Sequence, residues 1–247
     1  MLKLLCVTAH PDDEAGSFGG TLAKYAERGI ETYVVCLTAG TAARNRGGAK
    51  SDEELATMRR KEFANSCALL RIKRGDVLDF PDGKLDRVNF LDPVAEIVRR
   101  VREIRPQVML TIGTEGGVTA HPDHAMAALF ATAAYHWAGR SNRFVDQLES
   151  GLTPHRTQKL YYVTSDFDLP DRQPISPAPT TAILDVADFV STKIKAFATH
   201  TSQNPLLSLF ETHVKKHAGV ERFHLAASVT AKLATMETDL FTGVAAE

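Results

Sequence analysis

The chain of 247 residues is long enough to bury a sizeable core, either as one large α/β domain or as two small ones. Hydrophobic residues make up 44% and charged residues 24% of the sequence, which is ordinary for a globular protein and excludes a disordered or fibrous chain. Because the formal net charge is only -1, we expect no nucleic-acid partner and favour a small-molecule ligand.

The N-terminal residues carry one lysine and an apolar run that ends at His10, which is too short for a secretion signal. No stretch approaches the ~20 apolar residues of a membrane span. We therefore expect a cytoplasmic protein without a membrane anchor. The cysteines are widely spaced within apolar runs, which predicts buried thiols in place of disulfides. They are Cys6, Cys36 and Cys67.

The first half of the chain alternates apolar strand patterns with helical patterns. Lys3 to Ala9 and Thr32 to Leu37 indicate buried parallel strands, and Gly19 to Arg28 between them indicates a helix that ends at Gly29. A capping box of Ser51 and Glu54 predicts a helix to about Leu70. The next predicted strands are Asp76 to Phe80 and Val108 to Ile112, and the next helices are Pro93 to Ile104 and Pro122 to Trp137.

After Gly139 the alternation weakens. Strands are predicted at Lys159 to Thr164 and Thr181 to Val186, and an irregular, proline-rich loop at Leu169 to Pro179. Helical patterns cover Val186 to His200 and the stretch after Leu225.

The alternating elements predict an α/β fold, a Rossmann-like doubly wound, mostly parallel sheet with helices on both faces. No linker divides the chain, so we expect one domain over 1–247. Its parallel core would be 1–138, and an elaborated C-terminal third, 139–247, would complete the sheet and the pocket.

Two polar clusters follow the first and the fourth predicted strands. In doubly wound sheets these strands are commonly neighbours, and ligands bind at the carboxyl ends where the strand order reverses. Imidazoles with carboxylates suit zinc, and three protein ligands plus a water is the catalytic arrangement. The residues are His10, Asp12, Asp13 and Glu14 in the first cluster, and His121, Asp123 and His124 in the second.

Each residue taken alone has a simpler explanation. A single histidine after a strand is usually a helix cap or a satisfied polar contact, and aspartate beside proline makes turns. Two such motifs at the strand ends of one sheet favour a shared, open metal site.

The motifs resemble those of the LmbE-like or PIG-L-like N-deacetylase family. AHPDDE stands at 9–14, with GSFGGTLA close behind, and AHPDH stands at 120–124. Weaker matches follow in the family's order, and together they span nearly the whole chain. They are Arg59 and Glu62, then Pro81, Asp82 and Gly83, then Lys195, His200, Ser202 and Gln203.

The resemblance implies that His10, Asp13 and His124 bind zinc, and Fe²⁺ could occupy the same ligands in a cell. Zinc lowers the pKa of its water towards ~7 and polarises an amide carbonyl. Asp12 would be the general base, although adjacent carboxylates leave an exchange of roles between Asp12 and Asp13 open.

The resemblance also places a histidine at the substrate carbonyl. His121, kept protonated by Asp123, would stabilise the tetrahedral oxyanion. Arg59 and Asp82 would contact the substrate, but a solvated helix face and an ordinary turn explain these two residues equally well.

The function expected is removal of the N-acetyl group from an N-acetylated amino sugar or glucosamine conjugate. Two alternatives stay open, namely a zinc amidase acting on a different small-molecule amide and a non-catalytic binding protein that retains the metal. The sequence lacks the H-x-E and P-C-x-x-C motifs of nucleobase deaminases, and its Gly16, Gly19 and Gly20 do not match a dinucleotide-binding loop. A homo-oligomer is neither predicted nor excluded.

Overall fold

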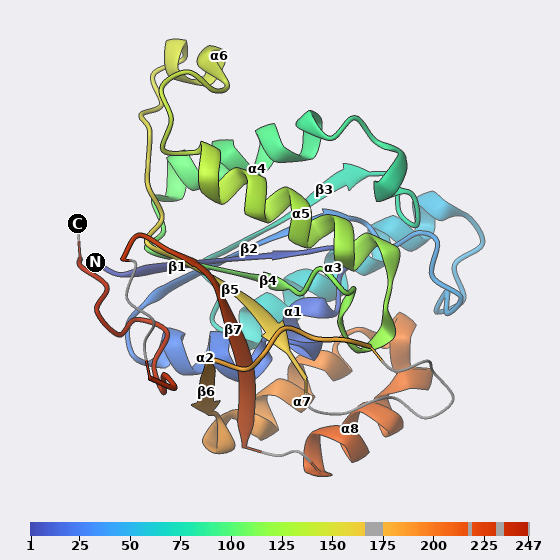
Figure 1. The fold of residues 1–247 in the computed structure, drawn as a ribbon. Coiled ribbons are helices and arrows are strands. Elements are labelled where there is room, and N and C mark those ends of the chain that lie inside the picture. The colour runs from blue at the N-terminus through green and yellow to red at the C-terminus, as the bar shows by residue number, and fades with distance from the viewer. Residues whose placement is uncertain (166–174, 217–218, 231–234, 247) are drawn as a thin grey trace.

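The computed structural model describes residues 1–165, 175–216, 219–230 and 235–246, which build a mixed sheet of seven strands (Figure 1). The strand order is β3-β2-β1-β4-β5-β7-β6. Neighbours from β3 to β5 pair in parallel, and β7 pairs antiparallel with β5 and β6. The strands are β1 (Lys3–Thr8), β2 (Glu31–Thr38), β3 (Arg74–Phe80), β4 (Val108–Ile112), β5 (Lys159–Thr164), β6 (Ala182–Asp185) and β7 (Val220–Ser228). This confirms the predicted α/β class with a mostly parallel sheet.

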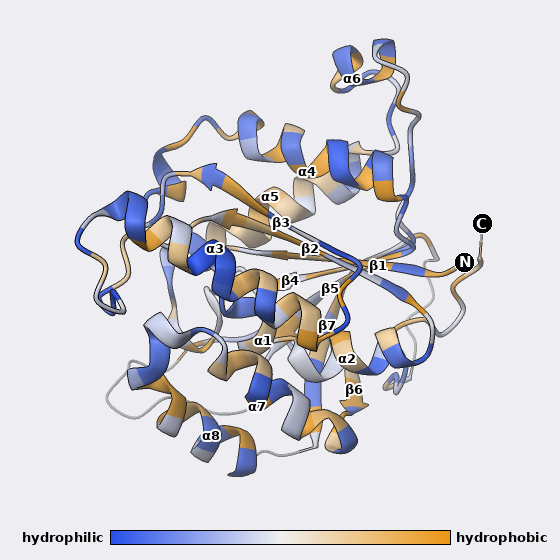
Figure 2. Cartoon of the chain, turned by 180° about the vertical axis from the view of Figure 1, so that it is seen from behind, coloured by the Kyte–Doolittle hydropathy of each residue, from blue (hydrophilic) through white to orange (hydrophobic). Residues whose placement is uncertain are grey.

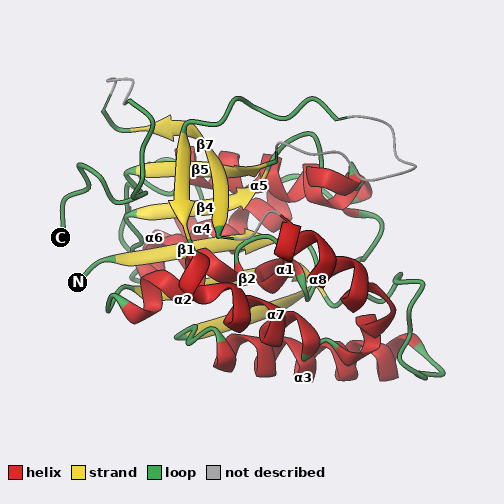
Figure 3. Ribbon diagram, turned by 90° about the horizontal axis from the view of Figure 1, so that it is seen from below, coloured by secondary structure: helices red, strands yellow, loops and turns green. Residues whose placement is uncertain are grey.

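Helices cover both faces of the sheet (Figures 1 and 3). One layer holds α1 (Asp13–Gly16), α2 (Gly19–Glu27), α3 (Asp52–Leu69) and α7 (Val190–Ala198), with α8 (Leu207–Lys216) packed on α7. The opposite layer holds α4 (Leu91–Ile104) and α5 (Pro122–Trp137), whereas α6 (Val145–Glu149) stands away from the sheet. Short 3-10 turns lie at Leu85–Arg87, Gly117–Thr119, Ala187–Phe189 and Thr201–Leu206.

The core lies between these layers, in one apolar cluster on each face of the sheet. Side chains alternate along β1, so that Leu4 and Cys6 enter one cluster while Leu5 and Val7 enter the other. Figure 2 shows the central strands coloured largely as hydrophobic. Burial on both faces explains why this strand is a continuous apolar run in the sequence.

The predicted elements of the first half are confirmed, with bounds that shift by up to two residues. Helix α3 begins after Ser51, whose side chain accepts a hydrogen bond from the Glu54 amide at 3.1 Å. The Glu54 carboxylate accepts from the Lys50 amide at 2.7 Å, one residue before the position that a capping box uses.

The C-terminal third corrects two predictions. The stretch after Leu225 is not helical, because Leu225 lies within β7, and residues 235–246 contain no helix. The alanines of β7 favour a helix locally, but ladders to β5 and β6 satisfy the backbone of this strand on both sides. The helix predicted from Val186 begins at Val190, and neither α6 nor α8 was predicted.

The irregular segment predicted at Leu169 to Pro179 lies partly outside the described residues, and 175–179 contain neither helix nor strand. Across the described part of the chain, no helix combines the length and the apolar character that a membrane crossing needs.

The strand order reverses at β1, and this place is the switch point of the fold. Its parallel neighbours are β2, which follows it in the chain, and β4, which comes about a hundred residues later. The carboxyl ends of β1 and β4 are therefore adjacent, and the two predicted polar clusters meet there.

Candidate metal centre and active site

The loop after β1 folds around the Asp13 carboxylate. Its Oδ2 accepts hydrogen bonds from the amides of Ala9 at 3.1 Å and His10 at 2.8 Å. These bonds fix the loop where the strand ends and α1 begins. Asp13 is only 8% exposed, so its carboxylate points into the protein and toward the β4 side of the switch point.

Three side chains converge at this point. The distance from His10 Nδ1 to His124 Nε2 is 3.1 Å, and the distance from His124 Nε2 to Asp13 Oδ1 is also 3.1 Å. The third side of the triangle, from His10 Nδ1 to Asp13 Oδ2, is 3.7 Å. Together they form one of two clusters of metal-ligand type among the described residues.

The outer nitrogens of both rings face oxygen acceptors. His124 Nδ1 lies 3.1 Å from the carbonyl of Gly116, and His10 Nε2 lies 3.1 Å from Asp82 Oδ1 and 3.4 Å from Asp123 Oδ2. With an N–H directed to each acceptor, both inner nitrogens present lone pairs to each other and to Asp13. Lone pairs at these distances repel unless a cation lies between them, and histidine ligands typically donate their other N–H in this way.

The residues therefore fit a metal ion. Two imidazole nitrogens and one carboxylate would supply the three protein ligands that catalytic zinc sites use, in which a water completes the shell. In the metal-free protein a proton takes the place of the cation: burial lowers the pKa of His10, but hydrogen bonds to Asp123 and Asp82 and the charge of Asp13 outweigh it and raise that pKa to about 10. Positive charge is strongly favoured at this point.

The second cluster of ligand type joins His10, His121 and Asp123. Here both oxygens of the Asp123 carboxylate accept main-chain hydrogen bonds, Oδ2 from Gly83 at 2.7 Å and Oδ1 from Leu85 at 3.1 Å. The two main-chain bonds to Asp13 both go to Oδ2, so its Oδ1 is the better placed ligand atom. The cluster that contains Asp13 is thus the better fit to a metal.

Asp123 contacts His121 through its main-chain amide, whereas its carboxylate faces His10. His121 Nδ1 accepts a hydrogen bond from the main-chain amide of Asp123 at 3.1 Å, as the N-cap of α5. A nitrogen that accepts a bond carries no proton, so the ring is neutral. Burial and the charges of His10 and His124 also lower the pKa of His121. Its Nε2–H is still a hydrogen-bond donor.

Asp12 lies next to Asp13 but faces a different partner. Its Oδ2 accepts a hydrogen bond from Arg59 Nη2 at 2.9 Å. Burial raises the pKa of Asp12, and the Arg59 charge opposes that shift. The backbone of Asp12 adopts φ 119°, a conformation that is strained for a residue with a side chain.

Arg59 and Asp82, for which the resemblance implied substrate contacts, point into the protein. Arg59 is 2% exposed, and its guanidinium also donates to the carbonyls of Gly40, at 2.8 Å, and Pro11. The Asp82 side chain is 5% exposed and accepts from the Ala42 amide at 2.6 Å as well as facing His10. These contacts hold other site residues in place, and a substrate contact of Arg59 or Asp82 stays a prediction.

Three further residues, Glu14, Ser66 and His200, form a buried hydrogen-bond network that holds the loop after β1. Glu14 is fully buried and accepts hydrogen bonds from the Asp12 amide at 2.9 Å, from Ser66 Oγ at 2.5 Å and from His200 Nε2 at 2.7 Å. The sequence singled out Glu14 within a motif, but no local pattern marks Ser66 of α3. His200 appeared only as a weak match, and its pairing with Glu14 spans 186 positions.

The fold and these side chains define a doubly wound α/β protein with a candidate two-histidine, one-aspartate metal centre at its switch point. Residues 5–135 match the PIG-L family, described as GlcNAc-PI de-N-acetylase. The chain belongs to this family.

Two relatives cover most of the chain. The chain is 32% identical over 204 residues to diacetylchitobiose deacetylase of Thermococcus kodakarensis, covering 82% of this chain and 70% of that protein. It is 28% identical to mycothiol S-conjugate amidase of Streptomyces coelicolor, covering 98% of this chain and 97% of the relative.

Solved structures share the fold. N,N'-diacetylchitobiose deacetylase from Pyrococcus horikoshii superposes with a TM-score of 0.74 at 24% identity, covering 90% of this chain and 83% of that one. GalB of Pseudomonas putida, a 4-carboxy-2-hydroxymuconate hydratase, gives 0.72 at 20% identity, covering 95% and 100%. The same fold thus supports more than one reaction, and function must be argued from the site.

Proposed function

We propose that this protein is a metal-dependent hydrolase that removes the N-acetyl group from an N-acetylated amino sugar or glucosamine conjugate. The observation that carries the proposal is the inward-facing set of His10 Nδ1, His124 Nε2 and the Asp13 carboxylate, with both outer ring nitrogens engaged. Membership of the family and the deacetylases among the relatives support the choice of reaction.

His10, Asp13 and His124 would hold the metal, zinc or ferrous iron. When bound, zinc lowers the pKa of a water towards ~7 and polarises the amide carbonyl. Asp82 and Asp123 position the His10 ring through its outer nitrogen, and the Gly116 carbonyl does the same for His124. These contacts keep both inner nitrogens aimed at the centre.

Asp12 acts as the general base in this proposal. Its carboxylate takes a proton from the attacking water and then delivers it to the departing amine nitrogen. Asp12 suits the role because its contact is with Arg59, outside the three-ligand cluster, and because burial raises its pKa. Arg59 serves as a positioning residue for this carboxylate.

His121 stabilises the oxyanion of the tetrahedral intermediate by donating its Nε2–H. A neutral ring can make this hydrogen bond, so the role does not require the protonated ring expected from the sequence. The Asp123 amide fixes the ring by occupying Nδ1, which places the proton on Nε2.

An amidase acting on a different small-molecule amide is the second candidate. It is favoured by the similarity to mycothiol S-conjugate amidase, which extends over nearly all of both chains. The same groups would carry out either hydrolysis, so the two candidates differ only in what the site accepts.

A panel assay tests the proposal. The zinc-loaded protein is incubated with N-acetylated amino sugars, and release of acetate and of free amine is measured, with Asp12→Asn as the control. Release that depends on Asp12 is expected. No release from any member of the panel, despite a full complement of bound metal, would refute the N-deacetylase assignment and shift weight to the amidase or to a binding role.

A further inference from the structure

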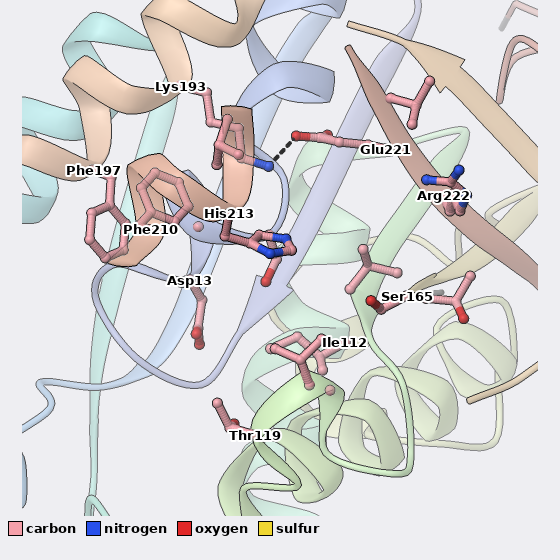
Figure 4. A pocket seen from close by; sticks show the side chains of 18 of the residues that line it. Asp13, Ile112, Thr119, Ser165, Lys193, Phe197, Phe210, His213, Glu221 and Arg222 are labelled. Atoms are coloured by element: carbon pink, nitrogen blue, oxygen red, sulfur yellow. Dashed lines mark hydrogen bonds and ion pairs between the residues drawn. The ribbon is translucent and has the colours of Figure 1, made fainter. Parts of the chain in front are cut away.

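A cavity of about 470 Å³ opens beside the candidate metal centre (Figure 4). Asp13 and His124 are among its lining residues, so the cavity reaches the candidate metal ligands. Its volume lies within the range of roughly 300–1,000 Å³ that is typical of small-molecule sites. In such sites a few polar groups on mainly apolar walls orient the ligand, so the charged side chains of the wall decide which ligand fits.

Three carboxylates belong to the described lining of this cavity, and two of them are satisfied within the protein. The first is Asp13, with its two main-chain donors. The second is Glu221, whose Oε1 lies 2.6 Å from Lys193 Nζ, a pair drawn in Figure 4, and which also accepts two main-chain hydrogen bonds from α2. The third is Glu115, and among the residues that the structure describes none forms a hydrogen bond or an ion pair with its carboxylate.

Glu115 lies in a tight turn at the carboxyl end of β4. The amide of Gly116 donates to the carbonyl of Gly113 at 3.0 Å, which closes the turn around Glu115. The carbonyl of Gly116 is the acceptor that faces His124 Nδ1 at 3.1 Å. Glu115 is therefore one residue away from the main-chain group that orients a candidate metal ligand.

The Glu115 carboxylate packs against the bare main chain of Gly113. A Cβ added to Gly113 would overlap both oxygens of this carboxylate. The φ angle of Gly113 is outside the left-handed region, so the turn itself does not require glycine there. Figure 4 shows Ile112 and Thr119, which stand before and after Glu115 in the chain, across the cavity from Phe210. The absence of a side chain at position 113 thus gives the carboxylate its place on this wall.

A half-buried carboxylate on the wall of a cavity discriminates between ligands. A ligand that fills the cavity takes water away from the carboxylate. A carboxylate that loses water and gains no donor is costly, so a ligand that offers a donor at this place is favoured over one that does not. Arg59 and Asp82 are not among the lining residues, so Glu115 would act on a different part of the substrate.

We propose that Glu115 is a specificity-determining residue, whose carboxylate accepts hydrogen bonds from donor groups of the substrate outside the acetamide. The inference rests on the proposed function, because the acetamide at the metal centre is what brings the remainder of the substrate into the cavity. The donor is either a sugar hydroxyl or an ammonium group on a neighbouring sugar, and the test separates these two sources.

The first experiment measures binding without turnover. Zinc-loaded Asp12→Asn protein is titrated calorimetrically with the methyl β-glycoside of N-acetylglucosamine, with its 3-, 4- and 6-deoxy analogues, and with a disaccharide of N-acetylglucosamine and glucosamine. Adding Glu115→Ala should weaken binding of the ligand that supplies the donor by roughly 10-fold to 100-fold, as for a hydrogen bond to a charged group. Glu149→Ala, which removes an exposed carboxylate outside the cavity lining, should change no affinity.

Gly113→Ala displaces the same carboxylate without removing it. The added methyl group takes the place of the carboxylate oxygens, and because these are the far end of a flexible side chain, the fold should tolerate the change. We expect a loss of affinity close to that of Glu115→Ala. Combining the two changes should cause no further loss, because no carboxylate is then left to displace. Both variants should keep one zinc per chain.

Two comparisons identify the donor. If it is a hydroxyl, one deoxy analogue should bind roughly 10-fold to 100-fold more weakly than its parent, and Glu115→Ala should remove this difference. Glu115→Gln should then keep most of the affinity, because its amide oxygen still accepts. If the donor is an ammonium group, the disaccharide with the free amine should bind more tightly than its diacetylated counterpart. Glu115→Gln should then lose as much affinity as Glu115→Ala, because the charge is gone.

Equal affinity with and without Glu115→Ala for every ligand overturns the inference. Loss of zinc from Glu115→Ala also overturns it, because Glu115 would then belong to the metal centre. The two proposals fail separately. Glu115-dependent binding, with no acetate release by protein that retains Asp12, would refute the proposed function and keep the inference. Acetate release at a kcat/KM that both Glu115→Ala and Gly113→Ala leave unchanged would do the opposite.

Discussion

Replacement of the buried Glu14 tests how the loop that carries Asp12 is held. Its carboxylate accepts hydrogen bonds from the Asp12 amide, Ser66 Oγ and His200 Nε2, and none of it is exposed. Glu14→Met keeps a side chain of similar length but leaves three buried donors without an acceptor. Each such donor costs about 1–3 kcal/mol, and with incomplete additivity we expect a loss of about 4 kcal/mol.

In a domain of this size each kcal/mol lowers Tm by roughly 2–4 °C, so the expected decrease for Glu14→Met is about 8–16 °C. Differential scanning calorimetry on the metal-free protein measures it, which keeps changes in metal affinity out of the comparison. Glu14→Gln should lose less stability, because its amide oxygen and amide N–H can each replace part of the network. Glu27→Met, at an exposed position of α2, is the control. A Glu14→Met protein whose Tm falls no further than that of the control would refute this account of the loop.

Three further changes test the assigned roles. Asp12→Asn should retain the metal yet slow turnover by roughly 100-fold to 10,000-fold, and near-wild-type turnover with full metal would exclude Asp12 as the base. His121→Ala should lower kcat by roughly 100-fold to 1,000-fold with little change in KM, since its bond belongs to the transition state; a defect confined to KM would contradict this role. Arg59→Met should lower the free energy of unfolding by about 3–5 kcal/mol, because Asp12 Oδ2 and the Gly40 carbonyl lose the donor that they share. A wild-type midpoint in urea would show that this ion pair is not needed.

The parallel core could be predicted from sequence because its signals are local. Each segment carries its own signal in the sequence: β1 is an apolar run, α5 begins at a proline, and a glycine follows α2. The rule that ligands lie where the strand order reverses then predicts that the two histidine motifs lie together. The contacts between His10, Asp13 and His124 follow from that topology.

The sequence could not show which buried contacts hold the loop of the site in place. Arg59 is followed by Arg60 and Lys61, a charge run that favours a solvated face, yet the Arg59 side chain turns inward to Asp12. Glu14 meets His200 only because α7 packs against α1 and α3, which is a tertiary contact without a local signal. Strand β7 was missed for a similar reason, because pairing with two strands overrides the helical preference of its alanines.

The most direct test of the central claim is a zinc titration of the metal-free protein, in which acetate release from an N-acetylated amino sugar is followed against zinc added per chain. We expect activity to rise in proportion to zinc and to reach its plateau at one equivalent, and His124→Ala should neither bind the ion tightly nor gain activity. Acetate release that does not depend on added metal, or full activity in His124→Ala, would contradict the assignment of His10, Asp13 and His124 as the metal centre of a hydrolase.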